Sequence, residues 1–278
     1  MGLNWLESML YGLVSGFADI LPISAQAHRT ILLKFFGIGI DPAFLRLFVH
    51  LGVLLAVFFT CQPMITKLMR ARSLARVPKR RRKRPLDTKS LMDLSLWKTM
   101  LIPVIIGFFF YEKLSGIGSN LIWMSCFLFV NGLILYIPQF LPGSNKDSRS
   151  LSRVEGLLMG LGGTLSMLPG LSGLGAAVSI GSVCGVERSY GLNMALLMNI
   201  GVNLGFVIFD VMAVASKGLT GITFLMILQC LVSGIVAFVG AMLGIKMMRS
   251  LAKNGGFSLF AYYCWGIALF SFILNLMA

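Results

Sequence analysis

The sequence contains little charge for its length. Only 12% of its 278 residues are Asp, Glu, Lys or Arg, only ten are acidic, and just two are histidines. A soluble chain of this size needs many more charged side chains to cover its surface. The low charge therefore excludes an ordinary soluble protein. A hydrophobic content of 57% and a mean hydropathy of +0.86 instead predict an all-α polytopic membrane protein.

Cysteine patterns and an N-terminal basic segment are also missing. The five cysteines are scattered along the chain, and none shows a CxxC or metal-ligand spacing. We interpret them as small apolar side chains buried in the membrane. The first residues, Met1 to Asn4, carry no basic n-region, which predicts that no signal peptide is removed.

Long apolar stretches dominate the remaining sequence. Six unbroken spans are expected at about 44–61, 97–113, 119–140, 190–214, 219–247 and 256–277. Two further apolar stretches, 4–36 and 153–186, are each interrupted near the middle. Half of such a stretch is too short to cross a hydrocarbon core of about 30 Å. The sequence therefore predicts two re-entrant helical hairpins in addition to the six transmembrane helices.

The order of these elements repeats along the chain. A hairpin followed by three spans occurs twice, which divides a single membrane domain into half-repeats of about 1–140 and 153–278. Because three is odd, the second half must enter the membrane in the opposite orientation. This order predicts an inverted-topology repeat whose two hairpins meet near the midplane of the membrane.

The two interruptions resemble each other. Leu21–Ser24 and Leu168–Ser172 each contain a proline and end on a serine, and the prolines are 147 positions apart. Proline removes a backbone donor and ends the preceding helix, so a new helix is expected to begin at about Ala25 and at about Gly173. Paired breaks in corresponding places of two halves point to a central binding site.

The start of each new helix is a candidate anion site. Its first turn offers N–H groups and the positive end of the helix dipole, which suit a phosphate or pyrophosphate. Ser24 and Ser172 occupy the N-cap positions, where a hydroxyl can cap the helix, contact a phosphate, or do both. Gly170, Gly173 and Gly175 allow the backbone to approach a ligand closely.

Few ionisable side chains fall inside the apolar stretches. His28 follows Ser24 by four residues on the same helix face, where it can act in chemistry or form a structural hydrogen bond. Asp19 lies just before the first break and can act as a base, bind a metal, or pair with Arg29. We interpret His50 as an interhelical hydrogen-bonding group and Asp210 as a partner for a helix end.

Basic residues are concentrated in one segment. Twelve of the 24 Lys and Arg residues lie between Lys67 and Lys98. Because basic loops stay on the cytoplasmic side, we expect a basic cytoplasmic loop over 62–96 with both chain termini outside. A membrane-topology signal explains this segment better than a nucleic-acid patch, and anionic lipid is a secondary partner.

Three segments carry a family resemblance. The run from Gly12 to His28, including Pro22-Ile23-Ser24, resembles the first motif of the bacterial undecaprenyl-pyrophosphate phosphatases, the bacitracin-resistance family. Leu168–Gly175 resembles the second motif of that family, usually PGxSRSG, and Phe48–Gly52 resembles a shared segment of the following span. The resemblance extends over almost the whole chain, and the two motifs together are specific.

The resemblance implies a fold of six spans and two re-entrant hairpins in the bacterial inner (cytoplasmic) membrane. It also implies removal of one phosphate from the C55 isoprenoid carrier pyrophosphate of cell-wall synthesis, usually with Mg²⁺ or Ca²⁺. The expected partners are this polyprenyl lipid, the membrane and a second copy of the chain as a homodimer, but not nucleic acid. The expected catalytic residues are Asp19, which is also the candidate metal ligand, Ser24 and His28. The expected phosphate-binding residues are Ser24, Gln26, Gly170, Ser172, Gly173 and Gly175.

The sequence also departs from the family pattern. Two glutamates of the first motif correspond to Ser15 and Asp19, and its Ser-Thr-Gly corresponds to Ala25-Gln26-Ala27. The arginine of the second motif corresponds to Gly173 and a later threonine to Ala177. A missing carboxylate and a missing guanidinium weaken acid–base and phosphate-clamping capacity. Two functions therefore stay open: a phosphatase with degenerate motifs, or a protein that binds or translocates a lipid phosphate without hydrolysing it.

Overall fold

The computed structural model describes residues 4–37, 42–117, 120–142, 145–217, 222–254 and 256–277. Regular structure in these residues is helical, apart from one isolated bridge between Lys146 and Val186. The α-helices are α1 (Trp5–Ile20), α2 (Ala25–Phe35), α3 (Ala43–Arg76), α4 (Thr88–Phe108), α5 (Tyr111–Gly116), α6 (Leu121–Tyr136), α7 (Arg153–Thr164), α8 (Gly173–Val183), α9 (Arg188–Lys217), α10 (Phe224–Asn254) and α11 (Ser258–Met277). Short 3-10 turns are η1 (Lys79–Arg81), η3 (Ile137–Phe140) and η4 (Leu165–Met167).

Six elements are long and apolar enough to cross a membrane: α3, α4, α6 continued by η3, α9, α10 and α11. Each of them overlaps one of the six spans expected from the sequence, although α4 ends at Phe108 and so before the expected end of the span 97–113. The prediction of an all-α polytopic membrane protein with six transmembrane helices is therefore confirmed.

The connection between α3 and α4 is shorter than the sequence analysis predicts. Instead of a loop over 62–96, α3 continues to Arg76 and α4 begins at Thr88, so that the connection spans 77–87. The helix bounds differ from the predicted loop bounds because hydropathy reports apolar character and not helicity, and the cytoplasmic placement of 62–96 stays a prediction. Lys, Arg, Leu, Met and Ala all favour helix, so α3 continues beyond the apolar stretch.

Each predicted interruption separates two short helices. Leu21–Ser24 lies between α1 and α2, and the segment 168–172 lies between η4 and α8. The longest of the four helices, α1, has 16 residues and measures about 24 Å, less than the thickness of a hydrocarbon core. Two helix–break–helix units are present as predicted, and their re-entrant insertion into a membrane stays a prediction.

The packing of the helices has the pattern of an internal repeat. The first unit packs through α1 on α10, and the second packs through α7 on α4. In the repeat, α1 corresponds to α7 and α10 corresponds to α4, so these two contacts are equivalent. In the same way α3 corresponds to α9 and α6 to α11, and the two helices of each pair contact each other. Glycines permit both close approaches. A Cβ at Gly12 would lie 2.3 Å from the carbonyl oxygen of Ser233, and one at Gly160 would lie 2.3 Å from the carbonyl oxygen of Met100.

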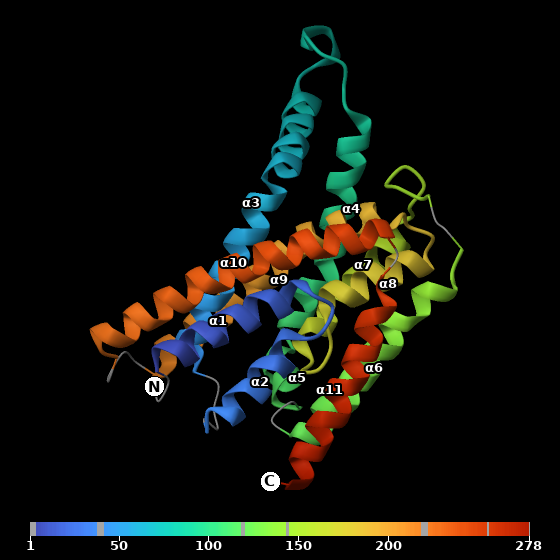
Figure 1. Cartoon of the computed structure of the whole chain (residues 1–278). Helices are drawn as coiled ribbons and strands as arrows, with labels where there is room; N and C mark the ends of the chain where they lie inside the picture. The colour runs from blue at the N-terminus through green and yellow to red at the C-terminus, as the bar shows by residue number, and fades with distance from the viewer. Residues whose placement is uncertain are drawn as a thin grey trace.

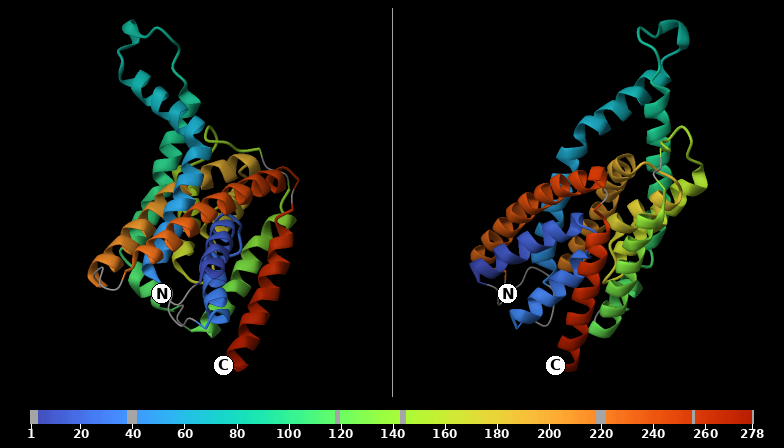
Figure 2. Two further views of the ribbon diagram at one scale, coloured as in Figure 1. Left: turned by 60° about the vertical axis from the view of Figure 1, so that its left-hand side comes forward. Right: turned by 45° about the vertical axis from the view of Figure 1, so that its right-hand side comes forward.

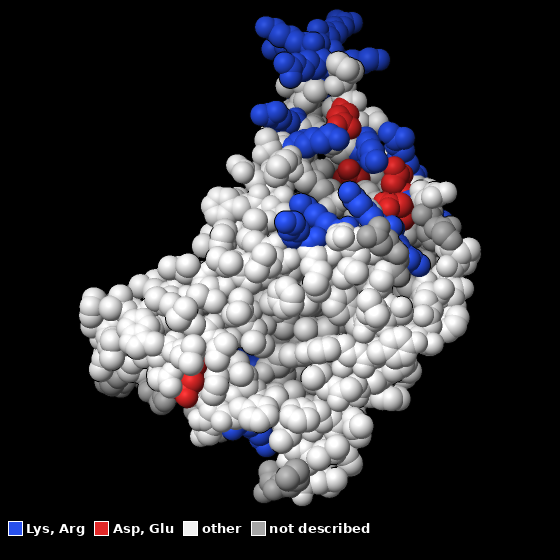
Figure 3. Space-filling view, in the orientation of Figure 1, with Lys and Arg blue, Asp and Glu red and all other residues white. Residues whose placement is uncertain are grey.

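The long helices surround the breaks, and α9 runs through the interior, where Met194–Met198 is fully buried. Figures 1 and 2 show the α3–α4 connection projecting from one end of the molecule, with both chain termini toward the other end. Lysines and arginines gather on the projecting end, and the middle of the face in Figure 3 is almost entirely uncharged.

The second helix–break–helix unit is tied to the end that carries the basic connection. Ser148, just before α7, donates a hydrogen bond of 2.5 Å to Asp93 in the second turn of α4, and Lys89 pairs with Asp147 at 3.0 Å. The backbone N–H of Lys146 donates to Gly185, directly after α8. Both ends of this unit therefore lie beside the start of α4, on the side opposite the chain termini.

Candidate functional site

The two breaks lie against each other. The Ser24 hydroxyl accepts a hydrogen bond from the backbone N–H of Gly170 (3.1 Å), and the Ser172 hydroxyl donates to the carbonyl of Leu21 (3.4 Å). Asn131 on α6 joins them, because its amide donates to the Pro22 carbonyl (2.8 Å) and accepts from the Ser172 N–H (2.9 Å). The predicted meeting of the two breaks is confirmed.

The helices that follow the breaks begin at one pocket. Its wall includes the first two residues of α2, Ala25 and Gln26, and the first two residues of α8, Gly173 and Leu174. N–H groups in a first turn have no partner within their own helix. The serine caps bond the third residue of each helix, at 3.5 Å in α2 and 3.2 Å in α8. The pocket therefore faces two positive helix ends, an arrangement suited to an anion.

Asp19 contributes a carboxylate to the same pocket from the last turn of α1. Its Oδ2 accepts hydrogen bonds from the side-chain amides of Asn199 (3.3 Å) and Asn203 (3.1 Å) on α9. Both asparagines are buried. The sequence analysis did not select them, although two asparagines spaced by four in an apolar span lie on one helix face and were a detectable signal.

Arg29 contributes a guanidinium to the pocket wall from α2. Its Nη1 donates to Nε2 of His50 on α3 at 3.2 Å. Because a guanidinium only donates, His50 Nε2 must accept, so Nδ1 carries the proton and donates to Asp210 Oδ2 on α9 at 2.6 Å. The other Asp210 oxygen accepts from Arg46 at 2.6 Å. The predicted interhelical role of His50 is confirmed, and Asp210 pairs with the side chains of His50 and of Arg46, which lies in the first turn of α3.

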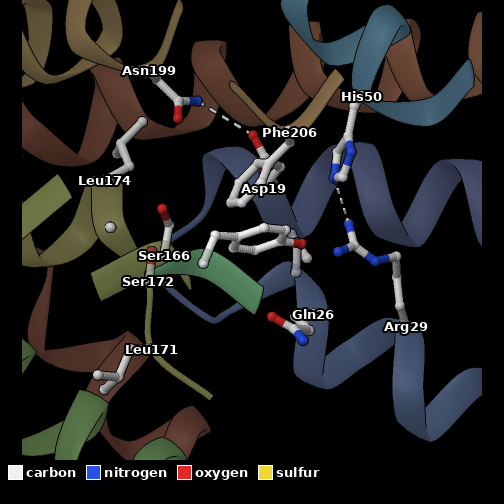
Figure 4. Close-up of a pocket in the computed structure, with 14 residues that line it drawn as sticks. Asp19, Gln26, Arg29, His50, Ser166, Leu171, Ser172, Leu174, Asn199 and Phe206 are labelled. Atoms are coloured by element: carbon white, nitrogen blue, oxygen red, sulfur yellow. Dashed lines mark hydrogen bonds between the residues drawn. The ribbon is translucent and has the colours of Figure 1, made fainter. Parts of the chain in front are cut away.

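Figure 4 shows how these groups surround the pocket. The Ser166 and Ser172 side chains lie on the left, Arg29 and His50 lie on the right, and Asp19 with Asn199 lies above the space between them. The space measures about 30 Å³, enough for a water molecule and less than a diphosphate requires. Binding of a diphosphate therefore requires side chains of the wall to move apart.

The predicted site residues fall into two groups. Asp19, Gln26, Ser172 and Gly173 line the pocket. The other four predicted residues, which do not line it, are Ser24, His28, Gly170 and Gly175. Gly170 and Gly175 are packing positions, since a Cβ at Gly175 would lie 2.4 Å from Pro22 and Gly170 adopts a φ of +102°.

His28 and Ser24 are both occupied by contacts outside the pocket. The Nδ1 of His28 donates to the Ser24 carbonyl (2.8 Å), and its Nε2 accepts from the hydroxyl of Tyr263 (2.8 Å), whose ring stacks on the imidazole. His28 lines a separate apolar cavity between α1 and α11. The Ser24 hydroxyl lies between two backbone N–H groups. The catalytic roles of Ser24 and His28 stay predictions, and this geometry favours structural roles.

The two positions that depart from the family pattern are closely packed. Ser15 is fully buried, one helical turn before Asp19, and its hydroxyl has no hydrogen-bond partner within the described part of the chain. A Cβ at Gly173 would lie 2.5 Å from the Gly163 carbonyl oxygen and 2.8 Å from Ser166 Cβ. The backbone around Gly173 therefore leaves no room for a larger side chain.

A resident divalent cation does not fit the donor groups of the pocket. The residues that the structure describes include no cluster of three or more His, Cys, Asp or Glu side chains. Asp19 shares its pocket with a guanidinium, and one of its oxygens already accepts two amide hydrogens. Mg²⁺ is usually held by one or two carboxylates together with substrate phosphates. An ion would therefore have to depend largely on a phosphate ligand, and the involvement of Mg²⁺ or Ca²⁺ stays a prediction.

Comparison with known proteins identifies the family of this chain. The model of the family described as bacitracin resistance protein BacA matches residues 8–270. The chain is 28% identical to an undecaprenyl-diphosphatase of Methanobrevibacter smithii, with 96% of each chain covered. It is 26% identical to undecaprenyl-diphosphatase 1 of Shouchella clausii (98% and 97% covered) and 27% identical to an undecaprenyl-diphosphatase of Thermosipho africanus (97% and 100% covered). With its two breaks and its six spans, this chain belongs to the bacitracin resistance protein BacA family.

Proposed function

We propose that this protein is a membrane phosphatase that removes the terminal phosphate of the C55 polyprenyl diphosphate used in cell-wall synthesis. The family membership and the names of the relatives support this activity. The observation that carries the proposal is the pocket itself, in which two helix starts, the Arg29 guanidinium and the Asp19 carboxylate face one buried space. Such a site suits a phosphate and the water that attacks it.

The proposed reaction is hydrolysis of the phosphoanhydride bond. The N–H groups that begin α2 and α8 hold the phosphate oxygens, and Asp19 orients a water and takes its proton. The water oxygen bonds to the terminal phosphorus while the bond from that phosphorus to the bridging oxygen breaks. The products are inorganic phosphate and the lipid monophosphate. The amides of Asn199 and Asn203 keep the carboxylate directed at the pocket.

The placement of the protein in the membrane completes the proposal. We place the α3–α4 connection in the cytoplasm and both termini outside a bacterial inner membrane, because basic segments remain on the cytoplasmic side. The clustering of Lys and Arg on that end supports this orientation (Figure 3). A divalent cation entering with the diphosphate and a homodimeric assembly are parts of the proposal that need separate tests.

The decisive experiment measures phosphate release from C55 diphosphate by the purified protein in detergent. The assay is run with EDTA, with Mg²⁺ and with Ca²⁺, alongside Asp19→Asn and the surface variant Asp147→Asn. The proposal expects release by the parent and by Asp147→Asn, and a loss of at least 100-fold in Asp19→Asn. Tight binding of the lipid without any phosphate release in all three conditions would instead favour the non-hydrolytic alternative. The observation that favours this alternative is that Asp19 is the one carboxylate among the described residues of the pocket wall, which limits its acid–base capacity.

A further inference from the structure

The pocket contains a cation that comes from an unexpected position. Arg29 is only 6% exposed, and it reaches the pocket wall from the second turn of α2. A buried guanidinium in a membrane segment is costly unless it has partners, and such groups mark functional sites. Arg29 is one of two ionised side chains in the wall, together with Asp19, among the residues that the structure describes.

Arg29 is held in place by a chain of side-chain contacts that begins at His50. The Arg29 guanidinium donates to Nε2 of His50, and Nδ1 of the same imidazole donates to Asp210. The negative charge of Asp210 is offset on its other side by Arg46. This chain of contacts therefore fixes the position of the guanidinium in the pocket wall.

Phe206 reinforces this arrangement from α9. Its ring stacks on the His50 imidazole, with ring centroids 5.1 Å apart, and it also lines the pocket. Asp210 is 1% exposed and does not line the pocket, so it acts on the pocket through His50. His50 lines the pocket beside Arg29 and orients the guanidinium.

The second break has no room for a cation of its own. An arginine at Gly173 would place its Cβ 2.5 Å from a backbone oxygen of α7. A guanidinium for this pocket must therefore come from another element, and Arg29 lies on the opposite side of the pocket from Ser172 (Figure 4).

We propose that Arg29 is the phosphate-binding cation of this pocket and that His50, held by Asp210, is its positioning residue. The positive charge that binds the phosphate thus comes from the helix after the first break and faces the helix start of the second. A planar guanidinium suits the oxygens of a diphosphate, since it can donate two parallel hydrogen bonds. The assignment of a polyprenyl diphosphate as the ligand rests on the proposed function, whereas binding through Arg29 does not require hydrolysis.

The test measures binding separately from turnover. The probes are a non-hydrolysable farnesyl methylenebisphosphonate, which carries both the tail and the charged head, and farnesol, which carries the tail alone. Affinities for the purified parent, Arg29→Gln, Arg29→Lys and Arg188→Gln are compared in one detergent. Arg188 is a matched control, because its guanidinium donates to the Pro138 carbonyl away from the pocket.

The expected result is a loss of about 10- to 100-fold in bisphosphonate affinity for Arg29→Gln, with farnesol affinity unchanged. Arg29→Lys keeps the positive charge but cannot donate two parallel hydrogen bonds, so its bisphosphonate affinity should lie between those of Arg29→Gln and the parent. The bisphosphonate affinity of Arg188→Gln should equal that of the parent. An Arg29→Gln protein that binds the bisphosphonate as tightly as the parent would overturn the proposal. So would equal losses for both probes, which would mean that Arg29 only supports the fold.

The positioning role has its own pair of variants. A glutamine at position 50 can accept from Arg29 with its oxygen and donate to Asp210 with its nitrogen, whereas a leucine can do neither. His50→Gln should keep most of the bisphosphonate affinity, and His50→Leu should lose it selectively over farnesol. Equal affinities in these two variants would remove His50 from the proposal. If the parent binds through Arg29 but releases no phosphate, the proposed function fails and this inference stands.

Discussion

The two breaks have the same architecture and different chemistry. Each follows a short helix whose N-terminus has a capping box, Asn4 with Glu7 in α1 and Ser152 with Glu155 in α7. Each ends in a serine that caps an 11-residue helix. The charged groups of the pocket, however, both come from the first unit, as Asp19 and Arg29.

The second break contributes a closely packed surface instead. Gly173 lies against Gly163 of α7, and Gly175 lies against Pro22 of the first break. From this side the pocket receives backbone N–H groups and the Ser172 hydroxyl. The comparison shows that the two units of a repeated fold can have different roles. Here the first unit supplies the charged side chains of the pocket, and the second supplies closely packed backbone around them.

The largest expected effect is at the carboxylate of the first unit. Asp19→Asn keeps the size of the side chain and removes its charge and basicity, so phosphate release should fall by about 100- to 10,000-fold. Size-exclusion chromatography and the melting temperature should remain close to those of the parent. An Asp19→Asn protein with parental turnover would show that the first unit does not carry the base.

The next effect tests the packed surface of the second unit. Gly173→Ala introduces a Cβ close to backbone atoms, which should destabilise the protein by about 1–3 kcal/mol and lower its melting temperature by about 5 °C. Gly266→Ala on α11 is the matched control, because its Cβ would meet nothing within 4 Å. For the same reason, Ser15→Glu combined with Gly173→Arg should fail to raise activity. A more active, stable double variant would show that the second unit can accommodate a charge.

The architecture followed from the sequence more fully than the site did. Pro22 and Pro169 marked the two breaks because proline ends a helix whatever surrounds it, and hydropathy located the six spans. The motif spacing also placed Asp19, Gln26, Ser172 and Gly173 near a common point. The breaks and the spans depend on proline and on local hydropathy, and the meeting of the motif residues depends on the internal repeat.

The remaining site depended on tertiary packing. His28 and Arg29 are adjacent in sequence, yet the helix turns them to different cavities, so that Arg29 meets the pocket and His28 meets Tyr263. The position of a side chain around a short helix depends on what packs beside it, here α3 and α11. The sequence analysis did not select Asn199 and Asn203 because it considered only ionisable side chains inside the apolar spans, and an amide is not ionisable.

A smaller effect separates the two capping serines. Ser24→Ala and Ser172→Ala should each cost about 1 kcal/mol of stability, since each hydroxyl caps a helix. Only Ser172 lines the pocket, so only Ser172→Ala should also raise the KM for the lipid diphosphate. Melting temperatures and steady-state kinetics of both variants test this difference. Complete loss of turnover in a folded Ser24→Ala protein would instead support Ser24 as a catalytic residue.

The smallest effect concerns the capping boxes at the entrances of the two units. Glu155 accepts from the Ser152 N–H (2.7 Å) and pairs with Lys146 (2.9 Å). These contacts, led by the backbone hydrogen bond from Ser152, lower the pKa of Glu155 to about 2. Because the folded-state pKa is depressed, the ionised form stabilises the fold above about pH 4.5, and this contribution is lost as the pH falls toward 2.

Glu155→Gln should therefore lower the melting temperature at pH 7 by about 2 °C or less, since the pair is partly exposed and screened by solvent. The difference from the parent should shrink as the pH is lowered from 5 to 3. Glu7→Gln in α1 is the matched variant, because Glu7 completes the equivalent capping box by accepting from Asn4 (2.7 Å) and forms no ion pair with the other described residues. A pH-independent difference for Glu155→Gln would mean that the cap geometry, and not the charge of Glu155, stabilises the start of α7.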